Sequence, residues 1–549
     1  MIEGFTPWTE KEAGEYKAKG YWPGLTIYQT LERWIKETPH KEAIVDEKVR
    51  LTYSQFGEAV DHLASALYRL NIREDDRVII QLPNWSEFLV CFFAVSRIGA
   101  ISVPVIPQFR KKDIGYLLKL TEATTIVIPD VYHDFNYIQM VRELQSESPL
   151  LKHVIVVGQQ VPQNMLPFSK LMVKVDETKP PPNLLDSLRP NPDEVVFISL
   201  TGGTTGFPKG VPHTHNDFVG ARLAFLKTAR WDTNTIILIN KPVELYASLA
   251  RGLSAFMGGG KMVLRTSSRP PDTLKAIEQE KITDLQIVPT EGVDLLGFPE
   301  THKYNTSSLR ELSCGVGAFT SEQLKSLGQR LGCKITKAYG MTEGISLITR
   351  PDDTIEVVLE TVGKPLSEAD EAKIVDETGA EVGVGIEGEL TFRGASVIRG
   401  YYKNPEATKE AVSADGFFHT GDLAVKDKNG NIRITGRKKD WIRRGGQTIV
   451  PLEVEAALMA HPDVEIAAVV AMPDPRLGEK ACAYIKPKNG QAISLEEVAS
   501  FLLEKGLAKY KLPEIIEIVF ELPLVGMGKV DKKALREDIT RKLAAESTK

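Results

Sequence analysis

Cysteine is scarce in this chain of 549 residues. Its four cysteines, Cys91, Cys314, Cys333 and Cys482, are widely spaced and form no CxxC pair. So few cysteines in so long a chain do not make a disulfide framework, and the spacing gives no metal-ligand pattern. The sequence therefore favours buried thiols in a reducing compartment.

An excess of charge of one sign is also lacking. The 68 Lys and Arg residues nearly balance the 73 Asp and Glu residues, which gives a formal net charge of −5. No run of like charges stands out along the chain. Because nucleic-acid-binding surfaces depend on clustered positive charge, we expect no nucleic-acid partner.

Long hydrophobic runs are missing as well. The most apolar stretch, residues 88–107, is interrupted by Arg97, Gly99 and Pro104, whereas a membrane span needs about 20 predominantly apolar residues. The first 20 residues mix in acidic side chains and contain no apolar core, so we expect no signal or transit peptide. The expectation is a cytoplasmic protein without a membrane span, of unspecified oligomeric state.

The chain does contain an alternation of short apolar runs and helical patterns. Runs at residues 77–83, 101–107 and 124–130 read as buried strands, with helical patterns at 87–97 and 111–120 between them. A second series of strands reads HVIVVGQQ, VVFISL, NTIILIN, KMVLR and LQIVPT. Such alternation favours βαβ units and a mostly parallel sheet.

The pattern changes twice more along the chain. Residues 175–194 are Pro-rich and polar, which is typical of a surface connection. From about residue 363, short alternating runs separated by turn residues predict antiparallel strands, and beyond Arg437 a small α+β pattern follows. We therefore predict an α/β fold. Residues 1–437 would form a large N-terminal body of two βαβ-type subdomains plus a β-rich one over 363–437, and residues 438–549 a small α+β domain.

One loop carries the clearest chemical signal. It follows the predicted strand VVFISL and reads Thr201-Gly-Gly-Thr-Thr-Gly-Phe-Pro-Lys209-Gly. Backbone N–H groups, hydroxyls and an ammonium group in one loop suit a polyphosphate. The GxxxxGK[ST] spacing of a Walker A loop is absent. A flexible turn is the plainer interpretation, but the density of Gly, Thr and Lys after a buried strand disfavours it.

Five motifs in this order resemble the acyl-adenylate-forming superfamily of acyl-CoA synthetases, peptide-synthetase adenylation domains and firefly luciferase. The overall pattern is closest to the stand-alone aryl-acid branch, typified by the 2,3-dihydroxybenzoate–AMP ligases. The loop over 201–210 resembles the family's phosphate loop. The other four motifs are Tyr339-Gly340-Met341-Thr342-Glu343, Thr420-Gly-Asp422, Gly436-Arg437-Lys-Lys439-Asp440 and Gly526-Met-Gly-Lys529.

The resemblance implies that the protein joins a carboxylate to AMP from ATP and then passes the acyl group to a thiol. Carboxylate and triphosphate are both anionic, so the first step needs cations and in-line positioning. By resemblance Lys529 would bridge the substrate carboxylate and the α-phosphate. Thr342 would hydrogen-bond the α-phosphate, and Glu343 would bind Mg²⁺, a hard ion that prefers oxygen ligands.

The remaining motif residues would hold the nucleotide. The phosphate loop would contact the β- and γ-phosphates, Asp422 would accept from the ribose hydroxyls, and Arg437 would support the same region. Taken singly, Asp422 could be a turn residue, Arg437 a surface ion pair and Lys529 a solvated lysine. Their order along the chain, relative to the other motifs, favours roles in one nucleotide-binding site. The implied nucleotide-binding set is Thr201, Gly202, Gly203, Thr204, Thr205, Gly206, Lys209, Gly315, Tyr339, Gly340, Met341, Asp422 and Arg437.

The second half-reaction involves the C-terminal domain. In the family this small domain is a mobile lid that rotates about the residue matching Lys439. The loop carrying Arg443, Arg444, Gly445 and Gly446 would then line the thiol tunnel, where glycines permit close approach; a plain hairpin turn is a compatible alternative. The acceptor is either CoA or the phosphopantetheine of an acyl or aryl carrier protein. Pro451 resembles free-CoA ligases, whereas the aryl-acid pattern resembles enzymes that load a carrier protein. The absence of the His-Asn pair of the siderophore enzymes narrowly favours CoA.

The predicted acyl pocket departs from the family pattern. Dihydroxybenzoate enzymes carry His-Asn after the strand that follows the phosphate loop, but residues 240–248 contain no His. Val243 or Leu245 stands where the His is expected, and Glu244 or Tyr246 where the Asn is expected. A buried Glu would repel an anion or require a cationic or hydroxylated partner, which argues against catechol acids. Cys314 and Val316 would complete the pocket, and aryl, alicyclic and aliphatic acids all stay open.

Other functions fit the residues less well. A non-catalytic nucleotide-binding relative has no reason to keep Thr342, Glu343, Asp422, Arg437 and Lys529 together, and no luciferin pocket is visible. The pair His213 and His215 lacks a third ligand, so packing or hydrogen bonding is preferred to zinc binding. The glycosylation sequons at Asn84 and Asn305 carry no meaning in a cytoplasmic protein.

Overall fold

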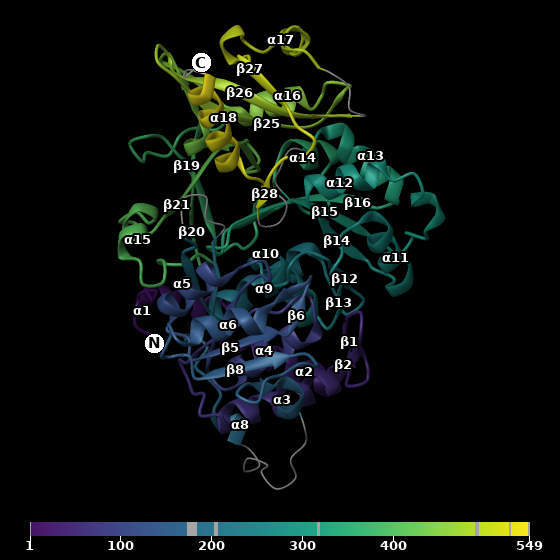
Figure 1. The fold of residues 1–549 in the computed structure, drawn as a ribbon, viewed down its shortest axis with the longest axis vertical. Coiled ribbons are helices and arrows are strands. Elements are labelled where there is room, and N and C mark those ends of the chain that lie inside the picture. Colours follow the sequence, from purple (N-terminus) through teal and green to yellow (C-terminus); the bar gives the residue numbers. More distant parts are fainter. Residues whose placement is uncertain are drawn as a thin grey trace.

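The computed structural model describes residues 2–172, 184–201, 207–315, 319–488, 493–525 and 529–546. Figure 1 shows the arrangement of the helices and strands. Gly202–Gly206 of the predicted phosphate loop and Val316 of the predicted acyl pocket lie outside the described residues, as does most of the first half of the predicted connection over 175–194. For Lys529 only the backbone is described.

The first sheet has seven strands in the order β11-β10-β4-β3-β5-β8-β9, and all neighbouring pairs are parallel except β10 with β11. Its central strands are buried on both faces because helices cover both sides. The strands are β3 (Arg77–Ile80), β4 (Ile101–Pro104), β5 (Thr125–Pro129), β8 (His153–Val157), β9 (Leu166–Pro167), β10 (Val195–Leu200) and β11 (Gly210–Thr214).

Helices on the two faces of this sheet build separate parts of the core. The helices α3 (Tyr53–Arg69) and α4 (Ser86–Arg97) pack with Val78 and Ile80, whereas α5 (Lys111–Thr121) and α6 (Tyr137–Gln145) pack with Ile79. The alternation of adjacent strand residues between faces explains this division. The apolar stretch over 88–107 is thus α4 followed by β4, and within the described ranges no helix is long and apolar enough to cross a membrane.

The second sheet has nine strands in the order β18-β17-β16-β15-β14-β12-β13-β1-β2. Its centre, from β16 to β1, is parallel. The chain enters this sheet first with β1 (Glu42–Val45) and β2 (Arg50–Thr52). The later strands are β12 (Ile236–Ile239), β13 (Lys261–Leu264), β14 (Asp284–Ile287), β15 (Glu311–Gly315), β16 (Lys334–Gly340), β17 (Ser346–Ile348) and β18 (Lys364–Pro365).

The division of strands between the sheets differs from the prediction. The runs HVIVVGQQ and VVFISL, predicted to begin the second series, form β8 and β10 of the first sheet. Conversely, β1 from the N-terminal region pairs with β13 of the second sheet. An apolar run indicates a buried strand but not which sheet buries it, because partner strands are chosen by packing across long stretches of chain.

Helices connect the parallel strands of the second sheet. They are α10 (Tyr246–Met257), α11 (Pro270–Glu280), α12 (Pro289–Gly297) and α13 (Ser321–Leu331). Because β12, β14, β15 and β16 are parallel, their carboxyl ends lie at one edge of the sheet. This is the edge at which open α/β sheets bind ligands. The YGxTE motif begins with the last two residues of β16, Cys314 lies near the end of β15, and the other described residues of the predicted acyl pocket follow β12.

Two antiparallel sheets complete the fold. One contains β19 (Glu371–Val375), β20 (Glu387–Arg393), β21 (Phe418–Lys426) and β22 (Ile432–Arg437). The other lies at the C-terminal end of the chain, drawn in yellow-green to yellow in Figure 1. It contains β23 (Ile442–Arg444), β24 (Gln447–Ile449), β25 (Val464–Asp474), β26 (Gly478–Pro487) and β27 (Ile515–Ile518), with α16 (Pro451–Leu458), α17 (Leu495–Glu504) and α18 (Lys532–Glu546).

The predicted fold class is therefore confirmed: a large α/β body is followed by a small α+β part. The four cysteines are free, and three of them are buried. Burial raises the pKa of the Cys314 and Cys482 thiols, in the latter case to about 12. They therefore stay protonated, as expected of structural rather than reactive cysteines.

Candidate functional site

The two ends of the predicted phosphate loop are joined to each other. The Thr201 N–H donates to the Lys209 carbonyl at 3.0 Å, and the Lys209 N–H donates to Thr201 Oγ1 at 3.0 Å. The first of these bonds continues the antiparallel pairing of β10 and β11 beyond Leu200 and Gly210. Thr201 and Lys209, at the two ends of the loop, therefore lie side by side. Lys209 Nζ is 4.2 Å from the ring centroid of Tyr401.

The YGxTE, TGD and GRxKD motifs meet at Asp422. Its Oδ2 accepts a hydrogen bond from Tyr339 Oη at 2.6 Å, and its Oδ1 lies 2.6 Å from Arg437 Nε. The antiparallel register of β21 and β22 places Asp422 directly opposite Arg437. Residues of three motifs that are far apart in sequence therefore meet at one buried carboxylate.

Glu343 lies in the turn after β16 and is only 5% exposed. Tyr401 Oη donates to Glu343 Oε1 at 2.7 Å. No other hydrogen bond or ion pair to this carboxylate is found among the described residues. A buried carboxylate with one oxygen held by a neutral hydroxyl suits a hard cation such as Mg²⁺, so the residue fits its implied role.

The neighbouring Thr342 is held through its backbone. His213 Nε2 donates to the Thr342 carbonyl at 2.9 Å, while His213 Nδ1 lies 3.2 Å from Asp217 Oδ1. His215 instead accepts the Ile27 N–H on Nδ1 at 3.1 Å, and burial lowers its pKa to about 3. The two histidines serve different partners, which agrees with hydrogen-bonding roles rather than a shared metal.

Four of the predicted acyl-pocket residues, Val243 to Tyr246, lie in the loop after β12 and at the start of α10. Val243 and Glu244 are buried, Leu245 precedes the helix, and Tyr246 begins it with its ring stacked on His213, 4.8 Å between centroids. Cys314 is buried near the carboxyl end of β15, which Gly315 terminates. These residues therefore gather at the predicted ligand-binding edge of the second sheet.

Glu244 is unusual in this setting. Its side chain is 4% exposed, and neither carboxylate oxygen has a hydrogen-bond partner within the described part of the chain. Burial raises its pKa well above the usual range, which favours the protonated, neutral form of the acid. The charge repulsion that argued against catechol acids is weaker for that form.

A buried ion pair lies beside the same loop. Lys241 Nζ is 2.5 Å from Glu291 Oε2, and both side chains are about one-tenth exposed. The pair joins the loop after β12 to α12, which follows β14. Lys241 Nζ also donates to the Gln286 carbonyl. No sequence pattern indicated this pair, because its members are fifty residues apart.

Asn84 is a residue that the sequence analysis missed. Its Nδ2 lies 2.8 Å from the carbonyl oxygens of Lys241 and Arg265 and 3.3 Å from that of Ile239. Its Oδ1 accepts the Val243 N–H at 2.8 Å. The side chain is buried, so the sequon is not a glycan acceptor site. Asn84 instead holds the loop that carries the predicted acyl-pocket residues.

The predicted thiol-tunnel loop is a tight hairpin between β23 and β24. Gly445 and Gly446 both have positive φ, 54° and 83°, as a two-residue turn of this kind requires. Arg444 Nε pairs with Glu514 Oε1 at 2.5 Å, and Arg443 stacks on Trp441. Lys439 lies in a short 3₁₀ turn over Lys438–Asp440, between β22 and β23.

Lys529 belongs to a two-stranded ribbon. β29 (Lys529–Val530) pairs with β28 (Leu524–Val525) in antiparallel fashion, and Lys529 is opposite Val525. The role of its side chain stays a prediction.

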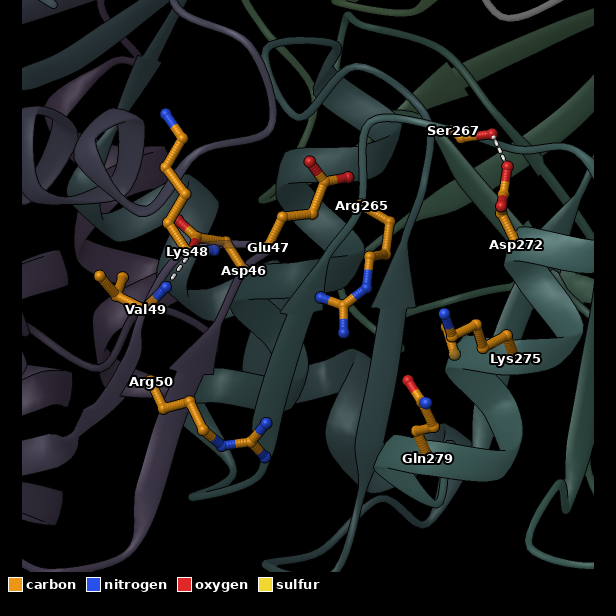
Figure 2. Close-up of a pocket in the computed structure, with 11 residues that line it drawn as sticks. Asp46, Glu47, Lys48, Val49, Arg50, Arg265, Ser267, Asp272, Lys275 and Gln279 are labelled. Carbon is orange, nitrogen blue, oxygen red and sulfur yellow. Dashed lines mark hydrogen bonds between the residues drawn. The ribbon is translucent and has the colours of Figure 1, made fainter.

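A surface pocket elsewhere contains none of the predicted site residues. It has a volume of about 530 Å³ and lies between the β1–β2 turn and α11. Figure 2 shows its lining of mixed charge, with Asp46 accepting the Val49 N–H and Ser267 donating to Asp272. Much of this lining is engaged in local bonds, so the pocket gives no second candidate site.

Comparison with known proteins finds similarity to AMP-binding enzymes along nearly the whole chain. The profile of the AMP-binding enzyme family matches residues 31–402, and that of the AMP-binding enzyme C-terminal domain matches residues 453–529. A 2,3-dihydroxybenzoate-AMP ligase of Bacillus subtilis is 36% identical, with 99% of each chain covered.

Two other relatives differ in the acceptor that their names give. A 2-hydroxy-7-methoxy-5-methyl-1-naphthoate–CoA ligase of Streptomyces carzinostaticus is 34% identical, with 97% of this chain and 96% of that one covered. A salicyl-AMP ligase / salicyl-S-ArCP synthetase of Mycobacterium tuberculosis is also 34% identical, covering 97% and 94%. The crystal structure of an anthranilate CoA ligase with anthranoyl-AMP superposes with a TM-score of 0.84 at 24% identity, covering 95% and 98%, which shows the shared fold.

Proposed function

We propose that this chain activates an aryl carboxylic acid and loads it onto the phosphopantetheine thiol of a carrier protein. The chain belongs to the family of AMP-binding enzymes that form acyl adenylates. The chain is an ATP-dependent, AMP-forming acid ligase. The observation that carries the finer proposal is the full-length similarity to ligases whose names specify aryl acids.

The reaction has two displacement steps. In the first, a carboxylate oxygen attacks the α-phosphorus of ATP and pyrophosphate leaves. In the second, the sulfur of a thiol attacks the acyl carbon, and AMP leaves with the bonding electrons. Both steps concentrate negative charge, so fixed cations and hydrogen-bond donors aimed at that charge lower the barrier.

We assign these roles to the motif residues. Lys529 would neutralise the charge that builds between the carboxylate and the α-phosphate. Lys209 and the phosphate loop would hold the β- and γ-phosphates. Asp422, buried and fixed by Tyr339 and Arg437, would accept from the ribose hydroxyls, since a carboxylate is an acceptor only.

Glu343 would hold Mg²⁺, which when bound supplies positive charge against the triphosphate. Thr342 would donate its hydroxyl to the α-phosphate. The His213 bond to the Thr342 carbonyl supports this role, because it limits movement of the turn that carries both residues.

Glu244 indicates which kind of acid the pocket accepts. In the protonated form that burial favours, it can both donate and accept a hydrogen bond, and a buried polar group without a partner is costly. A hydroxyl or amino substituent on the aryl ring would supply that partner. This supports aryl acids with a polar substituent over unsubstituted or aliphatic acids.

The C-terminal part would act in the second step. We propose that residues 438–549 move as a lid over a body formed by residues 1–437, turning at Lys439. The hairpin that carries Arg443 to Gly446 would then line the path of the thiol. Arg444 is engaged by Glu514, so Arg443 is the better candidate for contacting the acceptor.

Free CoA is the second candidate acceptor. The sequence narrowly favours it because the His-Asn pair is missing, and Pro451, which begins α16, resembles free-CoA ligases. One relative is named as a CoA ligase, but another is named for loading a carrier protein. A carrier protein agrees better than free CoA with the relatives that are named as aryl-acid–AMP ligases.

A direct comparison of acceptors tests this choice. The enzyme, ATP, Mg²⁺ and a panel of hydroxy- and aminobenzoic acids are incubated with free CoA or with a phosphopantetheinylated aryl carrier protein. We expect aryl-AMP to accumulate with CoA and a thioester to form on the carrier protein. Efficient aryl-CoA formation would overturn the carrier assignment and leave the adenylation step standing.

A further inference from the structure

Tyr401 touches two motifs that are proposed to hold different parts of the ATP–metal complex. Its hydroxyl donates to Glu343 Oε1 at 2.7 Å, and its ring centroid lies 4.2 Å from Lys209 Nζ. The side chain is only 5% exposed. Tyr401 belongs to none of the five motifs found in the sequence.

The segment around Tyr401 is itself attached to both motifs by its backbone. The Ile398 N–H donates to the Glu343 carbonyl at 3.1 Å, and the Tyr402 N–H donates to the Gly210 carbonyl at 2.9 Å. The Tyr401 N–H donates to Thr408 Oγ1 at 2.9 Å. The ring is therefore held in place by backbone bonds on either side of it, and none of these three bonds involves the side chain of Glu343 or of Lys209.

Each contact suits the charge that it meets. A hydroxyl that donates to a carboxylate forms a charge-assisted hydrogen bond, which is stronger than a neutral one. Because it occupies Oε1, it leaves Oε2 as the oxygen that can face a cation. The face of the ring attracts the Lys209 ammonium. One side chain thus orients an anionic and a cationic group at a fixed separation.

We propose that Tyr401 is a positioning residue for the metal–triphosphate complex, with its hydroxyl orienting Glu343 and its ring orienting Lys209. The proposal rests on the proposed role of Glu343 as the Mg²⁺ ligand. It separates the two contacts by chemistry: the hydroxyl serves the metal, and the ring serves the phosphate-binding lysine.

The substitution Tyr401→Phe tests this directly because it removes only the hydroxyl. The matched control is Tyr402→Phe, since Tyr402 is the next residue and its ring packs in the core of the first sheet that contains Ile79. ATP binding is measured by calorimetry without any acid, so no adenylate forms. Each protein is titrated in the presence of Mg²⁺ and again in the presence of EDTA.

We expect Mg²⁺ to strengthen ATP binding in the wild type and in Tyr402→Phe. In Tyr401→Phe the Mg²⁺-dependent increase in ATP affinity should be smaller by roughly tenfold or more, which is the scale of a lost hydrogen bond to a charged group. ATP binding in EDTA should be unchanged, because the ring remains. In Tyr401→Leu, which also removes the ring, binding in EDTA should weaken as well. Thermal unfolding of all variants checks that they are folded.

The proposal is overturned if Tyr401→Phe keeps the full Mg²⁺-dependent gain, or if it loses binding equally with and without Mg²⁺. It is also overturned if Glu343→Gln keeps that gain, since Glu343 would then not bind the metal. None of these results depends on the identity of the acid, so failure here is distinguishable from failure of the proposed substrate class or acceptor.

Discussion

Asp422 and Arg437 form an ion pair with 2.6 Å between Oδ1 and Nε, in which the carboxylate is almost fully buried and the arginine side chain is 41% exposed. The pair is fixed by the register of β21 and β22. Tyr339 donates to the second carboxylate oxygen from β16. The carboxylate is thus oriented before any nucleotide arrives, which is what precise recognition of a ligand requires.

We predict that Asp422→Asn weakens ATP binding by about tenfold or more, since hydrogen bonds to a charged acceptor contribute about 1.5–3 kcal/mol each. Calorimetric titration with ATP measures the effect. Asp427→Asn is the matched control, because Asp427 lies in the turn at the other end of the same hairpin and accepts bonds from its own loop. Equal ATP affinity in the two variants would exclude Asp422 from the nucleotide site.

Asn84 provides a second prediction. Asn84→Ala should lower the free energy of unfolding by about 2–4 kcal/mol, because it leaves buried backbone groups of the loop after β12 without partners. It should also raise KM for the acid more than KM for ATP. Urea unfolding and pyrophosphate exchange at varied acid concentration measure the two effects.

The control for Asn84 is the other sequon. Asn305→Ala removes an exposed side chain whose Oδ1 accepts the local Ser307 N–H, so it should change stability by about 0.5 kcal/mol or less. If both substitutions have the same small effect, Asn84 does not hold the loop.

The contrast between these two residues shows what the sequence could provide. The motifs could be recognised because each joins glycines and charged residues at a fixed spacing, and the structure brings three of them together at Asp422. Asn84 and Tyr401 could not be found in this way. Asn84 bonds to Arg265, 181 residues away in the chain, and Tyr401 contacts Lys209, 192 residues away, so only the folded sheets bring them together.

The arrangement of the sheets was predictable only in part for the same reason. Apolar runs identified the buried strands, but the crossing of β1 into the second sheet depends on its pairing with β13. The buried ion pair of Lys241 and Glu291 and the unpartnered state of Glu244 likewise depend on packing. The pKa of Glu244 follows from that burial and not from its neighbours in sequence.

Glu244 predicts a specific pH dependence. Its pKa in the folded chain is raised by burial, whereas in the unfolded chain it is about 4.3. Its contribution to stability is therefore complete below about pH 4 and is lost as the pH rises toward the folded pKa. Glu244→Gln should stabilise the protein more at pH 8 than at pH 5, by at most about 1.4 kcal/mol per pH unit.

Guanidinium unfolding of wild type and Glu244→Gln at pH 5 and pH 8 measures this difference. Asp370, whose pKa burial raises to about 6, titrates in both proteins and cancels in the comparison. Parallel pH dependence of the two proteins would mean that Glu244 ionises normally when folded.

The ion pair between Lys241 and Glu291 predicts a non-additive result. Lys241→Met alone should cost about 3–5 kcal/mol, because it leaves a buried carboxylate without its partner. Combining it with Glu291→Leu should restore most of that loss. Urea unfolding of both singles and the double variant measures the coupling, and a double variant no more stable than Lys241→Met would contradict it.

The central claim, that the protein adenylates an aryl acid, is tested most directly by exchange of labelled pyrophosphate into ATP. We predict exchange that requires both Mg²⁺ and a hydroxy- or aminobenzoic acid, and that is abolished by Lys529→Ala. Lys533→Ala, a change at an exposed lysine in α18, should leave the exchange intact. Exchange that proceeds unchanged in Lys529→Ala, or that no acid of the aryl panel supports, would contradict the account.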